Sequence, residues 1–143
     1  MDIFGAINIG SSALKAHSVR LNVISSNLAN MDTTRTPEGG PYKKKSVIFS
    51  TEKPDFAHEL EISGQQWVQG VKVKQIVNSP SEGKKIYDPS HPDADEKGFV
   101  EKPNISLVEE ITDMMRVKGS YDANVNSIKV AQRMALKALE IGR

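Results

Sequence analysis

The sequence predicts an α+β fold in which long helices at the two termini pair as a coiled coil, with a small antiparallel β domain and a long loop between them. Two observations predict it: a heptad pattern at each end of the 143-residue chain, and a change of hydrophobic period in the middle. Spacings of three and four residues bring side chains onto one stripe of a helix. We therefore divide the chain into an N-terminal assembly helix and turn (1–36), a β domain with an irregular loop (37–103) and a C-terminal assembly helix (104–143).

The N-terminal heptads predict one helix from residue 3 to about residue 31. Its apolar stripe consists of Ile3, Ile7, Leu14, Leu21, Ile24, Leu28 and Met31. Most other positions are Ser, Asn, Ala or Gly, and only Lys15 and Arg20 carry a full charge. A helix that faces water normally carries Lys and Glu on its outer side, and Gly and Ser lower helix stability. We therefore expect this helix to be covered by other helices, and to be marginal in the free monomer.

The middle of the chain changes to the two-residue period of strands. Asn30 to Thr34 and the Pro- and Gly-rich residues 37–41 end the first helix. Residues 46–49 and 71–76 are predicted strands, residues 56–62 are a weaker candidate, and residues 67–68 a further short one. The proline-rich stretch 78–103 is expected to be a loop.

The C-terminal heptads predict a helix over residues 105–141, with Asn104 as its N-cap. Glu109 and Glu110 in its early turns would complement the helix dipole. Gly119 is the weak point of its interior. The apolar stripe of this helix consists of Ile111, Met114, Tyr121, Val125, Ile128, Ala135 and Leu139.

Composition and charge exclude several function classes. The net charge of +1, from 19 basic and 18 acidic residues, gives no pull toward nucleic acid or anionic lipid. There is no cysteine, which excludes disulfides, thiol catalysis and zinc–thiolate sites. The first thirty residues lack the pattern of a cleaved secretory signal, and no stretch is apolar enough to cross a membrane. The low hydrophobic content of 38% indicates that partners contribute to stability.

The densest group of potentially reactive side chains lies between residues 88 and 96. Asp93 and Asp95 begin like a calcium loop, but Lys97 and Asn104 stand where oxygen ligands belong. We interpret the segment as a turn-rich loop whose acids bond its own backbone, and we expect no metal, no cofactor and no enzymatic activity. His17 is interpreted as a packed residue at a helix contact, and the lysines at 43–45 as a solvated strand edge.

Three stretches resemble known proteins. They are Ile24-Ser25-Ser26-Asn27-Leu28-Ala29-Asn30-Met31-Asp32-Thr33, the C-terminal segment with Glu110-Ile111, Met114-Met115 and Tyr121-Asp122-Ala123-Asn124, and the loop Tyr87-Asp88-Pro89-Ser90-His91-Pro92-Asp93-Ala94. Together they are similar to the bacterial flagellar rod and hook family, over essentially the whole chain. The family motif residues are Asn27, Leu28, Ala29, Asn30 and Thr33 in the turn and Asp88, Pro89, His91 and Pro92 in the loop.

The resemblance implies a structural subunit of the flagellar basal-body rod in the periplasm, exported by the flagellar apparatus without a cleaved signal. The terminal helices would form the inner tube and transmit torque. Implied partners are proximal rod proteins B and F, copies of the chain itself, the membrane-ring/rod junction protein E and the export apparatus; neither nucleic acid nor a small-molecule substrate is expected. The alternative is a cytoplasmic coiled-coil adaptor for another helical protein. A rod subunit should form open assemblies, whereas an adaptor should form a closed complex.

Overall fold

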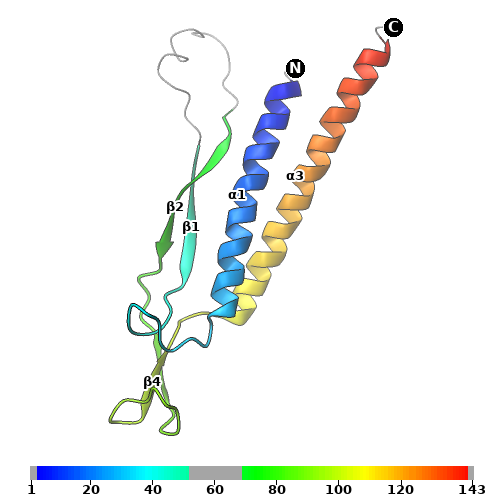
Figure 1. Ribbon diagram of the computed structural model, residues 1–143. Coiled ribbons are helices and arrows are strands. Elements are labelled where there is room, and N and C mark those ends of the chain that lie inside the picture. Colours follow the sequence, from blue (N-terminus) through cyan, green and yellow to red (C-terminus); the bar gives the residue numbers. More distant parts are fainter. Residues whose placement is uncertain (1–2, 52–68, 142–143) are drawn as a thin grey trace, which may run out of the picture.

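Two long helices lie side by side in the computed structural model, which describes residues 3–51 and 69–141 (Figure 1). This confirms the predicted α+β fold with paired terminal helices. The elements are α1 (Ile3–Ala29), β1 (Lys45–Thr51), β2 (Val71–Asn78), β3 (Lys84–Tyr87), β4 (Phe99–Lys102) and α3 (Leu107–Ile141). No helix of the described residues is both long and apolar enough to span a bilayer.

Helices α1 and α3 run antiparallel, so both chain termini lie at the same end of the molecule (Figure 1). We call that end the tip, and the opposite end, where α1 finishes and α3 begins, the base. Gly10 lies against Ile128 near the tip, and Asn27 donates a hydrogen bond to Glu110 at the base. Helix α3 has 35 residues and α1 has 27, and α3 extends beyond the start of α1 at the tip (Figure 1).

The seam of α3 differs from the predicted stripe at two positions. Ile111 is 39% exposed and Leu139 is 72% exposed. Residues Glu110 and Val117, both buried, instead continue the four-and-three spacing of the seam. The first turns of α3 are apolar on more than one side, which explains the error at Ile111. Leu139 is in the last turn of α3, and the end of that helix extends past α1 (Figure 1).

The predicted N-cap of α3 is also wrong. Ser106 caps the helix: its hydroxyl accepts a hydrogen bond from the Glu109 amide (3.5 Å), and its carbonyl accepts one from the Glu110 amide (3.0 Å). The residue between the two candidates, Ile105, is buried. Packing of Ile105 into the core therefore delays the start of the helix past Asn104.

The two main predicted strands are confirmed and are longer than expected. Strands β1 and β2 pair antiparallel, with a bulge where the register shifts between Ile48 and Phe49. This hairpin packs on α1 and not on α3, so α1 is the middle layer of the molecule (Figure 1). The predicted candidates at 56–62 and 67–68 lie outside the described residues.

The prediction of a loop over residues 78–103 is wrong. Residues 84–87 and 99–102 form a second antiparallel hairpin, in which Lys84 pairs with Lys102 and Tyr87 with Phe99. The two hairpins form separate sheets and not one β domain core. Of the prolines that suggested a loop, Pro89 and Pro92 lie in the connection between β3 and β4, and Pro80 and Pro103 lie just outside the two strands, so none interrupts the pairing.

The apolar core lies in the half of the molecule toward the base. Described apolar side chains that are buried are Ala16, Val23, Ile24, Val100, Ile105 and Val117. Toward the tip, over residues 4–15 of α1 and 118–141 of α3, no described apolar side chain is buried. Packing is therefore strongest at the base and declines along the helix pair.

Candidate assembly surface and polar junction

The family turn motif ends α1 through the side chain of Asn30. The Asn30 amide nitrogen and its side-chain Nδ2 both donate to the Ser26 carbonyl, at 3.1 and 2.8 Å. Thr33 then donates from its backbone N–H to the Asn30 carbonyl and from its hydroxyl to Asn30 Oδ1. Leu28 is half-buried and Ala29 is exposed. The motif therefore fixes the direction in which the chain leaves α1.

Asn27 joins α1 to the first strand. Its Nδ2 donates to the Lys45 carbonyl (2.9 Å), and its Oδ1 accepts from the Lys45 amide (2.9 Å). Oδ1 also accepts from the Tyr42 hydroxyl (3.2 Å). Asn27 is 1% exposed, so its side chain, and not water, supplies the hydrogen bonds to the Lys45 N–H and C=O at the start of β1.

Glu110 completes the contact from α3. It is 2% exposed, and its Oε2 accepts a hydrogen bond from Asn27 Nδ2 (3.1 Å). Its Oε1 lies 2.7 Å from Lys44 Nζ. Glu110 lies in the first turn of α3, as predicted, and has these further partners there. The interpretation of Lys44 as part of a solvated strand edge is wrong, because its ammonium group pairs with a buried carboxylate. We call the cluster of Asn27, Tyr42, Lys44, the Lys45 backbone and Glu110 the polar junction.

The loop at residues 88–98 is a compact turn, as predicted. Asp88 Oδ1 accepts hydrogen bonds from the Ser90 hydroxyl (2.6 Å) and the Ser90 amide (3.2 Å). His91 Nδ1 accepts from the Asp93 amide (3.1 Å). Gly98 has φ +78°, a backbone conformation in which a side chain would be strained. A Cβ atom added to Gly98 would lie 3.2 Å from the Cβ of Pro89. The exposed Pro92 follows His91 in the same turn.

Two acids of this loop serve as hydrogen-bond acceptors for the backbone. Asp95 Oδ1 accepts from the amides of Lys97 (2.9 Å) and Phe99 (2.8 Å). The Phe99 amide bond holds the pKa of Asp95 below its ordinary value, and the Ser90 hydroxyl does the same for the pKa of Asp88. These bonds stabilise the charged carboxylates. Among the described residues, no group of three or more His, Cys, Asp or Glu side chains is placed to hold a metal ion.

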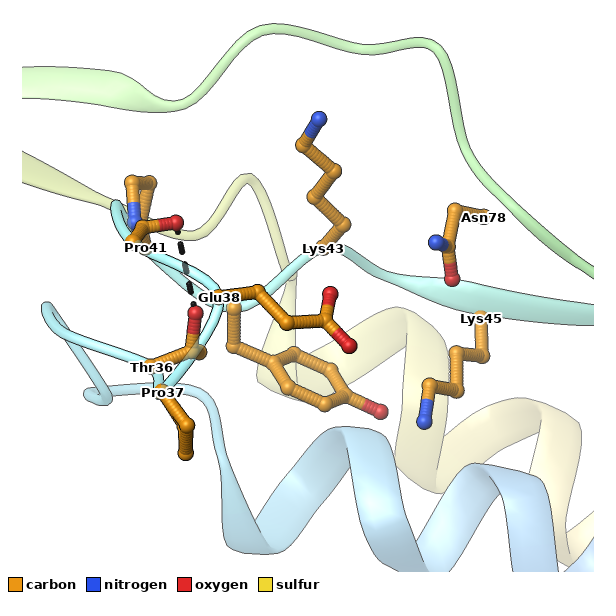
Figure 2. Close-up of a pocket in the computed structure, with 9 residues that line it drawn as sticks. Thr36, Pro37, Glu38, Pro41, Lys43, Lys45 and Asn78 are labelled. Atoms are coloured by element: carbon orange, nitrogen blue, oxygen red, sulfur yellow. Dashed lines mark hydrogen bonds between the residues drawn. The ribbon is translucent and has the colours of Figure 1, made fainter.

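A hollow of about 300 Å³ lies between the turn after α1 and the start of the first hairpin. Figure 2 shows its lining, with Lys43 directed away from Glu38. Lys45 Nζ lies 5.6 Å from the centroid of the Tyr42 ring, which also lines the hollow. The hollow pairs no nucleophile with a base, and its turn is closed by the Thr36 hydroxyl, which donates to the Gly39 carbonyl (3.3 Å).

The predicted assembly residues fall into three groups by exposure. Ile24 is buried; Ile111 and Leu139 are exposed, and the side chain of Ile3 lies outside the described part of the chain. The half-buried members are Ile7, Leu14, Leu21, Leu28, Met114, Tyr121, Val125 and Ile128.

Large apolar side chains are exposed on α3 away from its seam. Near the base, Val108 (75% exposed), Met115 (70%) and Ile111 lie on one outer face, since their spacing is three and four residues. Near the tip, the exposed residues are Met134, Leu136, Leu139 and Ile141. Exposed apolar patches of this kind are typical of surfaces that contact other proteins.

Comparison with known proteins agrees with the fold and the motifs. Residues 7–35 match the family Flagella basal body rod protein, and residues 96–141 match the family Flagellar basal body rod FlgEFG protein C-terminal. The chain is 41% identical to a Bacillus subtilis protein over 100% of both chains. It is 41% identical to a Borreliella burgdorferi protein over 98% of this chain and 99% of the relative. A Salmonella typhimurium protein is 36% identical over 100% of both chains.

All three relatives are named flagellar basal-body rod protein FlgC. The loop motif at residues 87–94 predicts proximal rod protein C as the most similar family member, and the names confirm it. The chain therefore belongs to the flagellar basal-body rod proteins and, within them, to the FlgC family.

Proposed function

We propose that this chain is a structural subunit of the flagellar basal-body rod, and that it assembles through the sides of its helix pair that its own fold leaves exposed. The observation that carries the proposal is the apolar outer face of α3 in a chain that matches rod proteins from end to end. Its chemistry is burial of apolar surface and not catalysis.

The seam between α1 and α3 supplies the stiffness of the subunit. Most predicted assembly residues are half-buried there, so the single chain already covers part of each side chain. Contacts between subunits then use the remaining surface, in particular Val108, Ile111 and Met115 near the base and Leu139 near the tip. Burying one large apolar side chain contributes roughly 1.5–3 kcal/mol, so a few such residues per subunit give a firm lateral contact.

The rod setting follows from the same proposal. The subunit crosses the inner membrane through the flagellar export apparatus without a cleaved signal, and then orders in the periplasm at the growing tip of the rod. Its neighbours are proximal rod proteins B and F, copies of itself and the membrane-ring/rod junction protein E. The helix pairs surround the export channel and pass torque from subunit to subunit.

The test places charge on the outer face of α3. In the Val108→Glu/Met115→Glu variant both positions are exposed, so the monomer should keep its circular dichroism spectrum and urea midpoint. Gln75→Glu, at an exposed position on β2, is the matched control for one added charge. In a strain without the chromosomal copy, the double variant should abolish swimming and rod assembly, whereas the control should restore both.

Swimming at the wild-type level by the double variant would contradict the proposed surface. The mass of the complex formed with purified rod proteins separates the alternative function. Open assemblies that grow with concentration support a rod subunit. A complex of fixed small mass would instead favour an adaptor.

A further inference from the structure

Asn27 and Glu110 are the buried polar residues of the described chain, and they meet where three elements converge. Asn27 comes from the end of α1, Glu110 from the first turn of α3, and Lys44 precedes β1. The rest of the described core is apolar. The polar junction is therefore the place where the first hairpin is tied to both helices at once.

Directional bonds at this place restrict the orientation of the hairpin. A buried carboxylate is tolerated when its oxygens have charged or hydrogen-bonding partners, and here they have Lys44 Nζ at 2.7 Å and Asn27 Nδ2 at 3.1 Å. Asn27 holds the N–H and the C=O of Lys45 at 2.9 Å each. If the hairpin rotated about α1, these bonds would break while the groups remained out of water.

The other contacts of the hairpin constrain it less. Its inner face packs on α1 through half-buried valines and Phe49, and apolar contacts have no preferred direction. One hydrogen bond, from the Val71 amide to Ser12 Oγ (3.0 Å), holds the far end of β2. That bond is neutral and partly buried, so it costs less to exchange for water.

We propose that the polar junction sets the angle between the β1–β2 hairpin and the helix pair, so that hairpin and helices move as one body. Asn27 and Glu110 are positioning residues, and Glu110 acts on the hairpin through Lys44. The proposal rests on the proposed rod function for its purpose, because a subunit that transmits torque must not bend between its parts. Its geometry can be tested on the purified chain alone.

The test measures the distance between two spin labels, one at Gln75 on β2 and one at Ser127 on α3. Both positions are exposed, and the chain has no cysteine, so Cys introduced at these two sites will be labelled selectively. The double-labelled chain should give one narrow distance distribution. Asn27→Asp places two carboxylates in contact and removes the donor to both Glu110 and the Lys45 carbonyl, so the distribution should broaden at least twofold. Ser12→Ala is the matched control and should leave its width within a quarter of the wild-type value.

A compensating variant separates positioning from general damage. In Asn27→Asp/Glu110→Gln, the amide introduced on α3 can donate to the carboxylate introduced on α1, and that carboxylate can also pair with Lys44. This variant should recover part of the narrow distribution, because the contact between residues 27 and 110 is restored while the Lys45 carbonyl still lacks its donor. A narrow distribution in folded Asn27→Asp, or no recovery in the double variant, would overturn the proposal. If Asn27→Asp does not fold, recovery of both folding and width in the double variant decides the question.

Failure here is distinguishable from failure of the rod assignment. The distance distribution requires no assembly, and the swimming assay of the α3 variants requires no junction variant. Suppose that the α3 variant loses swimming while the junction variants keep the wild-type distance distribution. The proposed rod function would then stand, and only the junction proposal would be wrong.

Discussion

Helix α1 comes close to α3 at Gly10, and a side chain added at this position should create a measurable packing conflict. A Cβ atom built on Gly10 lies 2.7 Å from Ile128 Cγ1 and 3.0 Å from its Cδ1. The same atom on Gly119 of α3 meets nothing within 4 Å. Both glycines are inside helices. Gly10→Ala and Gly119→Ala are therefore a matched pair that differ in packing and share the gain in helix propensity.

The magnitudes follow from these two terms. Ala is more favourable than Gly inside a helix by about 0.8–1.0 kcal/mol, so Gly119→Ala should stabilise the chain by about that amount. Overpacking typically costs about 1–3 kcal/mol, so Gly10→Ala should range from nearly neutral to about 2 kcal/mol destabilising. The difference between the two variants cancels the propensity term, and we expect about 1–3 kcal/mol.

Urea unfolding followed by circular dichroism measures both free energies. The Ile128→Ala background identifies the cause, because it removes the two atoms that the new methyl group meets. In that background Gly10→Ala should lose its penalty and stabilise by about 1 kcal/mol, the propensity gain alone. Equal stabilisation by Gly10→Ala and Gly119→Ala in the wild-type background would refute the contact between Gly10 and Ile128.

Three further outcomes are expected. His17→Leu should raise the free energy of unfolding by about 1 kcal/mol, since the buried Nδ1 of His17 has no hydrogen-bond partner in the described structure; a lower urea midpoint would contradict this. The pKa values of Asp88 and Asp95 are lowered from 3.8, so the two carboxylates stabilise the second hairpin fully above that pH, and this stabilisation is lost as the pH falls through the lowered pKa values. Chemical shifts of the loop should report the loss, and unchanged shifts down to about pH 2 would contradict it. Hydrogen exchange of the dilute monomer should show protection highest in residues 16–29 and lowest in residues 130–141, because the buried side chains lie toward the base; uniform protection along the helices would count against the gradient.

Periodic patterns made the helices and the main hairpin predictable. Heptad spacing in each terminal segment places a stripe of side chains on one side, and the paired helices follow from two such stripes. Alternation in residues 71–76 identifies a strand whose inner residues Val71 and Val73 are half-buried. In each case the pattern extends over enough residues for the period to be unambiguous.

The second hairpin was not predictable for a local reason. Its strands have four residues each, which is too short for a two-residue period to stand out. Nearby prolines favoured a loop, although Pro89 and Pro92 occupy the connection between the strands and Pro80 and Pro103 lie outside the hairpin. Val100, which is almost completely buried, is paired with Ile86.

The polar junction could not be derived from sequence because it depends on distant residues. Asn27 and Glu110 are 83 residues apart, and their contact requires the antiparallel register of α1 and α3. A glutamate in the first turn of a helix is already explained by the helix dipole, so nothing local indicates another partner. One signal was present: Glu110 occupies the four-and-three spacing of Met114 and Val117, a position where an apolar residue is expected.

The composition of α1 leads to a final prediction about the side of that helix that no described part of the chain covers. The hairpin and α3 cover two sides, yet the exposed positions Ser11, Ser18 and Ser25 remain small and uncharged. Water alone does not account for this, since a solvated helix gains from Glu or Lys at such positions. We therefore expect Ser18→Glu to leave the monomer as stable as wild type or slightly more stable, because Glu is the better helix former. In the rod, a charge on this side should meet a neighbouring subunit, and swimming should fall. Reduced monomer stability would refute the solvent-exposed placement of Ser18, and wild-type swimming would show that this side of α1 faces open water in the assembled rod.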